Sequence, residues 1–368
     1  MKEKQKEIKL VPDVLKALRE TSGYSIEEVA KKLKAHKEKI TSVEEGKDSF
    51  TLKQIHKLAE VYKYSLAAFF SDSSPKLPAV QDYRINREKK LTPQVYLAVR
   101  KAQYLSEKLK EISKKRSQIP SFPEQLNAEE LAKTFRKFLK DKFNVESINS
   151  KKPEEILTSY KKNLEDNLTI IVVEYPLKAD DVRAFSILSD VSVIVMNEND
   201  KPSIKLFSLF HEICHLLKRT AGICSLDIEP QNQDIENYCN RFAVEFLVPA
   251  DDLESEVKNF GQIDNKAINQ LTEIYAVSKQ VMMIRLLWLN YMGKERYEEF
   301  KKEVEEGMKQ KKQKKFGHRN WEKIYLNRIG QLVINEVKKS YIEEKITFYE
   351  ASSVLDLKTK YAEKFIIP

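Results

Sequence analysis

Two histidines four residues apart, with a glutamate directly after the first, are the residues of this sequence best suited to chemistry. They are His211, Glu212 and His215, within the apolar run PSIKLFSLFHEICHLL at Pro202–Leu217. On a helix, residues four apart leave the same face about one turn apart, so both imidazoles can bind one metal ion. Glu212 then stands where it can take a proton from a water on that metal. A zinc ion lowers the pKa of such a water from about 16 toward 7, which supplies the nucleophile that peptide-bond hydrolysis needs.

A catalytic zinc keeps three protein ligands and leaves one position for water. No other histidine lies within a hundred residues of this pair, so a carboxylate is expected as the third ligand. The downstream candidates are Asp227, Glu229, Asp234, Glu236 and Glu245. Glu236 begins a helix expected over about 233–247 and shares a face with Asn240, so we favour Glu236 as the ligand and Asn240 as the residue that holds a ligand in place. Glu245 lies close to half a turn round that helix and would point away.

The segments FSLFHEICHLL and ENYCNRFAVEFLVP, in this order, resemble the ImmA/IrrE-type metallopeptidases. The pattern of that family runs approximately FTxxHExxHxx, a short insert, then ExxANxFAxxLLxP. The resemblance implies that His211, His215 and Glu236 are the metal ligands and that Glu212 is the general base. It also implies a metal-dependent endopeptidase that cleaves a helix-turn-helix repressor, which would release stress or mobile-element genes.

The N-terminal region carries two capping boxes, Ser25–Glu28 and Thr51–Gln54, in which a hydroxyl residue precedes Glu or Gln by three positions. Two short helices joined by a tight turn at Lys34-Ala35 describe a helix-turn-helix. The segment SIEEVAKKLKAHKEKITSVEEGKDSFTLKQIHKLAEVY resembles the XRE (lambda-repressor-like) helix-turn-helix family over its whole length, with Lys34 in place of the usual Gly of the turn.

This second resemblance implies that His36–Glu45 is the recognition helix, with Lys37, Glu38 and Ser42 at positions that face base edges. Lys37 could donate to guanine, Glu38 could accept from cytosine and Ser42 is permissive. DNA contact through residues 25–47 therefore stands beside a second interpretation, in which the domain docks a repressor partner by pairing like with like.

The remaining segments are expected to be mostly helical around a small sheet. Strands are expected at Leu168–Glu174, Val182–Ile187 and Val191–Met196, the last two at hairpin spacing. A sheet edge beside a metal can bind an extended substrate strand through backbone hydrogen bonds. Helices are expected at Leu91–Lys115, Ala128–Phe143, Pro153–Leu164, Gln262–Asn290 with a break at Ser278, Trp321–Lys339 and Thr347–Lys364.

The expected fold class is α+β and mostly helical, with the sheet antiparallel. Four segments follow: an XRE-type helix-turn-helix domain at 1–72, a linker and long helix at 73–120, the HExxH peptidase domain at 121–260, and a C-terminal helical region at 261–368. The linker is expected because SDSSPKLPAVQDY is rich in Ser and Pro.

The composition points to a cytoplasmic protein. The chain has 368 residues, three cysteines without paired metal spacing, and no apolar run in its first ten residues. Sparse, odd-numbered cysteines are typical of a reducing compartment, and Cys214 and Cys239 read as core residues. The net charge of +9 is spread along the chain, and its densest cluster, Lys309–Lys315, reads as a solvated linker that could add phosphate affinity.

The sequence therefore predicts a zinc-dependent endopeptidase that acts in transcriptional regulation, with Mn²⁺ as the alternative metal because a His/His/Glu set discriminates poorly. The expected partner is a protein substrate, a helix-turn-helix repressor, with no membrane contact. A homodimer is compatible with the sequence. The alternative function is a DNA-binding regulator whose peptidase-like domain is a sensor or scaffold without turnover. Tyr238 and Arg183 are the candidates for a second oxyanion donor.

Overall fold

The computed structural model of the protein describes residues 7–75, 81–82, 91–145, 152–179, 182–220, 222–224, 234–310 and 320–367. The chain divides into two compact units. One contains the N-terminal helices together with the first turns of α5 (Pro93–Ser113), and the other contains the sheet and the remaining helices. None of the helices in the described ranges has the length and apolar content needed to cross a membrane.

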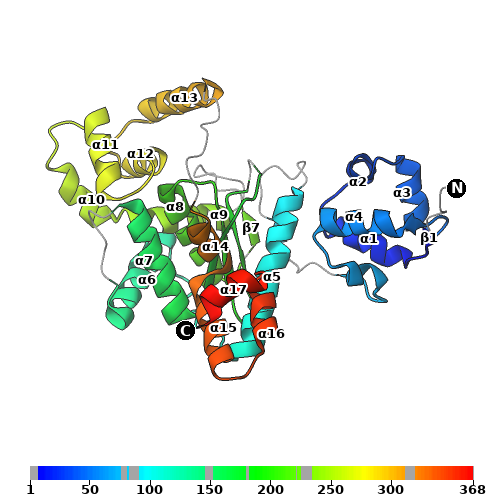
Figure 1. Ribbon diagram of the computed structural model, residues 1–368. Coiled ribbons are helices and arrows are strands. Elements are labelled where there is room, and N and C mark those ends of the chain that lie inside the picture. The colour runs from blue at the N-terminus through cyan, green and yellow to red at the C-terminus, as the bar shows by residue number, and fades with distance from the viewer. Residues whose placement is uncertain are drawn as a thin grey trace. The chain divides into compact units, whose positions relative to one another are not determined.

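The N-terminal unit is a small, mainly helical domain (Figure 1). Both predicted capping boxes are present, at the starts of α2 and α4. Lys34 ends α2 with a left-handed backbone (φ +55°), the conformation that a glycine would adopt without strain. A short antiparallel pair joins β1 (Glu7–Ile8) to β2 (Phe50–Thr51). The helices are α1 (Pro12–Glu20), α2 (Ile26–Leu33), α3 (Lys37–Glu44), α4 (Leu52–Tyr62) and the 3-10 helix η1 (Leu66–Phe70).

The central sheet has the strand order β3-β7-β5-β6-β4. The predicted hairpin is confirmed, because β5 and β6 pair in antiparallel register from Ala184↔Met196 to Ile187↔Val193. The sheet as a whole is mixed rather than antiparallel as expected, because β4 pairs with β6 in parallel, and the segment that joins them contains β5. The strands are β3 (Gln81–Asp82), β4 (Ile171–Tyr175), β5 (Ala184–Ile187), β6 (Val193–Asn197) and β7 (Gly222–Cys224).

Helices surround this sheet, and one of them, α8, lies against β5 and β6 (Figure 1). Aromatic rings fill the space between α8 and its neighbours, with Phe210 and Phe246 stacked at a centroid distance of 3.8 Å. The helices of this part of the chain are α6 (Ala128–Phe143), α7 (Pro153–Leu168), α8 (Pro202–Leu217), α9 (Asp234–Leu247), α10 (Ala250–Val257), α11 (Asn265–Ile274), α12 (Lys279–Trp288) and α13 (Lys294–Gln310). The predicted break at Ser278 is confirmed, since its side chain caps α12.

The C-terminal region is helical, as predicted. The prediction of two uninterrupted helices, Trp321–Lys339 and Thr347–Lys364, was wrong. Each is interrupted, giving α14 (Trp321–Ile329), α15 (Gln331–Ile342), α16 (Phe348–Val354) and α17 (Thr359–Ile366). Gly330 separates the first two at φ +85°, where a Cβ would lie 2.9 Å from Glu165 Oε1. The buried carboxylate of Glu165 accepts a hydrogen bond from the backbone amide of Leu332 at 3.3 Å. This bond satisfies one of the free amides in the first turn of α15. Asp356, at φ +51°, lies between the second pair.

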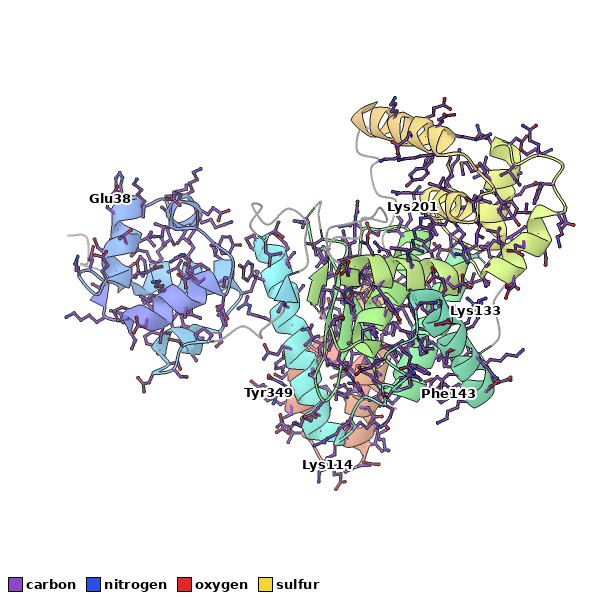
Figure 2. All side chains as sticks on the ribbon, turned by 180° about the vertical axis from the view of Figure 1, so that it is seen from behind. Glu38, Lys114, Lys133, Phe143, Lys201 and Tyr349 are labelled. Atoms are coloured by element: carbon purple, nitrogen blue, oxygen red, sulfur yellow. The ribbon has the colours of Figure 1, made fainter. Side chains whose placement is uncertain are left out.

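The α+β, mostly helical class is therefore confirmed: an N-terminal helix-turn-helix domain, a central domain with a small sheet, and C-terminal helices. The strand predicted from Leu168, β4, begins at Ile171, because α7 continues to Leu168 and ends at Thr169 in a left-handed conformation. Figure 2 shows the side chains on this framework.

Candidate active site

Helix α8 carries His211, Glu212 and His215. It begins with Pro202 in its first turn, where the missing amide proton is not needed, and every residue from Lys205 to Leu216 is buried. The burial follows from its position, because β5, β6, α7 and α9 all pack against it. A helix enclosed on all sides holds its side chains in fixed directions, which is what a metal site needs.

An ionic contact fixes the start of α8 on the sheet. The Lys205 ammonium donates to Glu174 of β4 at 2.6 Å, and Lys161 of α7 donates to the same carboxylate at 3.0 Å. Burial would raise the pKa of Glu174, but the two lysines outweigh burial and lower it. Because both lysines lie on helices and the carboxylate lies on a strand, the three groups link α7 and α8 to β4.

Three side chains from two helices converge at one point. The Nε2 atoms of His211 and His215 lie 3.1 Å apart. The carboxylate of Glu236, on α9, lies 3.4 Å from the first Nε2 and 3.2 Å from the second. All three residues are 0% exposed. Sequence reasoning placed these residues in one cluster, and the structure brings them together.

The hydrogen bonds of the two Nδ1 atoms show that the Nε2 atoms of His211 and His215 carry the lone pairs. The His211 Nδ1–H donates to Asn240 Oδ1 at 2.9 Å, since that oxygen can only accept. Thr220 Oγ1 lies 3.1 Å from His215 Nδ1 and can accept its proton in the same way. Both Nε2 atoms then present lone pairs to the same point that the Glu236 carboxylate faces. Asn240 thus occupies the orienting position predicted for it.

This arrangement suits a divalent cation. Two atoms that are each about 2.0–2.1 Å from one tetrahedral zinc ion lie about 3.3 Å from each other, and the three observed separations are 3.1, 3.2 and 3.4 Å. Within the described ranges, neither carboxylate oxygen of Glu236 accepts a hydrogen bond. Buried acceptors without donors are costly, and a cation would satisfy them. The residues present therefore fit a metal ion.

The electrostatics of Glu236 agree with this fit. Burial would raise the pKa of its carboxyl group, but the contacts with His211 and His215 outweigh burial and lower that pKa to about 2. The carboxyl group is therefore ionised at neutral pH, as a metal ligand must be. A metal ion bound by both imidazoles would supply the positive charge that this carboxylate faces.

Glu212 has a partner that sequence reasoning missed. The Ser186 hydroxyl, on β5, donates to Glu212 Oε2 at 2.7 Å, and both residues are 0% exposed. The sequence did hold a signal for this contact. Strand residues alternate between faces, so Ser186 lies on the same face of β5 as Ala184, which packs in the core with residues of α8. Ser186 is the polar residue on that face. Thr220 was also missed, since it follows α8 in a segment with no periodic pattern.

The other acidic candidates lie elsewhere. Glu245 forms a buried ion pair with Arg285 of α12, which explains why it points away from the histidines. Asp234 is exposed at the start of α9. Asp227 and Glu229 fall outside the described residues.

The two candidates for a second oxyanion donor have other partners. The Tyr238 hydroxyl donates to the Leu126 carbonyl at 2.7 Å, and Arg183 Nη1 donates to Asp200 at 2.7 Å.

Cys214 is buried with 0% exposure on the inner side of α8. It therefore packs as an apolar side chain.

In the helix-turn-helix domain, α3 presents the three residues predicted to face DNA. Lys37 and Glu38 are exposed in its first turn, and Ser42 is half-buried one turn later. Figure 2 shows Glu38 at an outer end of this domain. The last turn of α3 is anchored by Arg19, which donates to both carboxylate oxygens of Glu44 at 2.7 and 2.8 Å. The inner face of the helix is buried through Ile40 and Val43, and its first turn is left open to solvent.

Comparison with known families assigns both regions. Residues 165–287 match the family model of the IrrE N-terminal-like domain (peptidase family M78), and residues 13–68 match a helix-turn-helix domain model. The chain joins a helix-turn-helix domain to an IrrE-type peptidase domain. The IrrE-type match begins in α7 and ends in α12, so it contains β4, α8 and α9. The predicted architecture is confirmed, and the chain has a regulator-type domain beside a metallopeptidase-type one. No curated protein matches the chain.

Proposed function

We propose that this protein is a zinc-dependent endopeptidase that cleaves a helix-turn-helix repressor and so activates stress or mobile-element genes. One observation carries the proposal: His211, His215 and Glu236 converge within 4.8 Å, with Glu212 on the same helix between the two histidines. A site that only stabilised the fold would have no need of Glu212. Mn²⁺ remains the alternative metal, since ligands of this type bind both.

The chemistry divides between the metal and the chain. A divalent cation at this site would supply a Lewis acid that lowers the pKa of water and polarises the scissile carbonyl. Glu212 accepts a proton from the attacking water and then delivers it to the leaving amine. Ser186 holds one oxygen of Glu212, so the carboxylate keeps a single orientation while it takes and gives the proton. Asn240 and Thr220 orient the two imidazoles.

The substrate class follows from the second domain. A helix-turn-helix on the same chain would bring the peptidase to its substrate, either by binding operator DNA through Lys37, Glu38 and Ser42 or by docking a repressor of similar fold. In both cases the substrate is a transcriptional repressor. Deleting residues 1–72 should then slow cleavage without removing the metal.

The test is Glu212→Gln in cells that also express a helix-turn-helix repressor as the candidate substrate. The variant keeps the size and hydrogen-bonding capacity of the side chain but cannot take a proton. Mass mapping of repressor fragments should show cleavage by the parent chain and none by the variant, with equal metal content in both. Unchanged cleavage by Glu212→Gln contradicts the mechanism. Absence of cleavage by either chain, with metal bound, favours a sensor without turnover.

A further inference from the structure

One edge of the central sheet is occupied by a segment of the chain's own linker. Strand β3 pairs in parallel with β7, with Gln81 opposite Gly222 and Asp82 opposite Ile223. In the described part of the chain, β3 is the outermost strand on that side of the sheet. It belongs to the sheet-containing unit, although η1 before it and the first turns of α5 after it belong to the other unit.

The occupied edge lies beside the candidate site. Strand β7 pairs with Ala184 and Phe185 of β5, and the next residue of β5, Ser186, donates to Glu212. Thr220, which contacts His215, precedes the first residue of β7 by only two positions. Extended backbone at the β7 edge therefore runs alongside both the general base and a metal ligand.

A second observation concerns access to the site. The three candidate ligands and Glu212 are all 0% exposed. An extended polypeptide therefore has to reach these groups from the edge of the sheet beside them, which is the edge that β3 occupies.

We propose that the outer edge of β7 is the docking edge for an extended polypeptide substrate, and that β3 occupies this edge in competition with it. The inference rests on the proposed peptidase function and adds its regulation. An extended segment adds to a sheet edge through main-chain hydrogen bonds, which are the same groups that β3 uses. Because β3 is part of the same chain, it holds the edge at a high effective concentration. Substrate binding then requires the linker strand to leave.

The size of the effect follows from the docked fraction. If only a fraction of molecules has the edge open, the apparent dissociation constant of the substrate rises by the inverse of that fraction. A strand docked in about 90% of molecules weakens apparent binding about ten-fold. Competition of this kind raises KM and leaves kcat unchanged.

Two matched double variants separate the backbone from the side chains. Gln81→Pro/Asp82→Pro removes both amide donors, so whichever residue donates to β7 loses its hydrogen bond. Gln81→Ala/Asp82→Ala retains both amides and changes only the side chains. Each is made in the full chain carrying Glu212→Gln, so that a bound polypeptide is not cleaved. The probe is fluorescently labelled casein, an unfolded polypeptide, and anisotropy measures its dissociation constant.

We expect the proline variant to bind casein about ten-fold more tightly than the parent, and the alanine variant to bind like the parent. Hydrogen exchange at the amides of Gly222–Cys224 should become faster in the proline variant alone when no casein is present. Equal affinities in all three chains overturn the proposal. Weaker binding by the proline variant also overturns it, because the polypeptide would then add to β3 rather than replace it.

The two proposals fail differently. In the first case, the proline variant binds casein more tightly, but with Glu212 restored it cleaves no protein in the presence of zinc. This result supports the docking edge and contradicts the peptidase function. In the second case, the parent cleaves protein, but the proline variant shows neither a higher affinity nor a lower KM. This result supports the peptidase function and contradicts the docking edge.

Discussion

Removing the Ser186 hydroxyl tests how the chain holds its general base. In Ser186→Ala, Glu212 Oε2 loses a buried hydrogen bond of 2.7 Å that a neutral hydroxyl gives to a carboxylate. Hydrogen bonds to charged groups contribute about 1.5–3 kcal/mol. If the bond serves the reacting orientation of Glu212, its loss lowers kcat by roughly 10- to 150-fold, since about 1.4 kcal/mol is one factor of ten.

The assay separates this positioning role from simple stabilisation. Steady-state cleavage of the repressor should show the loss in kcat, with KM and metal content near those of the parent. Ser186→Thr keeps the hydroxyl and should recover much of the rate. The matched control is Ser208→Ala, because Ser208 is also buried, lies on α8, and donates only to the Ile204 carbonyl at 3.0 Å.

The reasoning would be refuted by a Ser186→Ala enzyme with parental kcat. It would equally be refuted if Ser208→Ala lost as much kcat as Ser186→Ala, since the effect would then follow from loosening α8. A fall in metal content that matched the fall in rate would move the role of Ser186 from Glu212 to the metal.

Three further predictions concern stability and the metal. Burial raises the pKa of Glu165 from 4.5 to about 7. The folded chain therefore keeps a proton that the unfolded chain loses above pH 4.5. Because of this group, the free energy of unfolding should fall by about 3 kcal/mol between pH 4.5 and 7. Glu165→Gln should flatten that part of a denaturant-derived pH profile, and an unchanged slope contradicts the assignment. Arg285→Met leaves Glu245 buried and unpaired and should cost about 3–5 kcal/mol in urea unfolding, most of it recovered by Arg285→Met/Glu245→Leu; no recovery in the double variant would locate the cost elsewhere. Asn240→Ala should weaken metal binding about 10- to 100-fold in a chelator competition, and parental affinity would show that Asn240 does not orient His211.

The ligand cluster could be predicted from sequence because its signals are local. His211 and His215 are fixed relative to each other by the helix, and Glu236 and Asn240 are fixed in the same way one helix later. What brings the two helices together is packing of apolar faces, which both runs display. The face shared with Asn240 favoured Glu236 among the acids, and the family resemblance implied the same residue.

Apart from the contact of Thr220 with His215, the contacts that were missed join distant segments. Ser186 meets Glu212 across 26 positions of sequence, and nothing in a strand pattern states which helix its face will meet. The break at Gly330 depends on the Glu165 carboxylate, which comes from another helix. The parallel pairing of β4 with β6 likewise follows from the crossover between them and not from the strand residues themselves.

The most direct test of the account is metal stoichiometry measured by mass spectrometry of the purified chain and of three single variants: His211→Ala, His215→Ala and Glu236→Ala. The account predicts one zinc ion per parent chain, and loss of that ion to a weak chelator in all three variants, with Ser208→Ala behaving like the parent. Retention of the ion in Glu236→Ala at parental affinity, or absence of any divalent metal from the parent chain after zinc loading, would contradict the claim that these three side chains bind one cation.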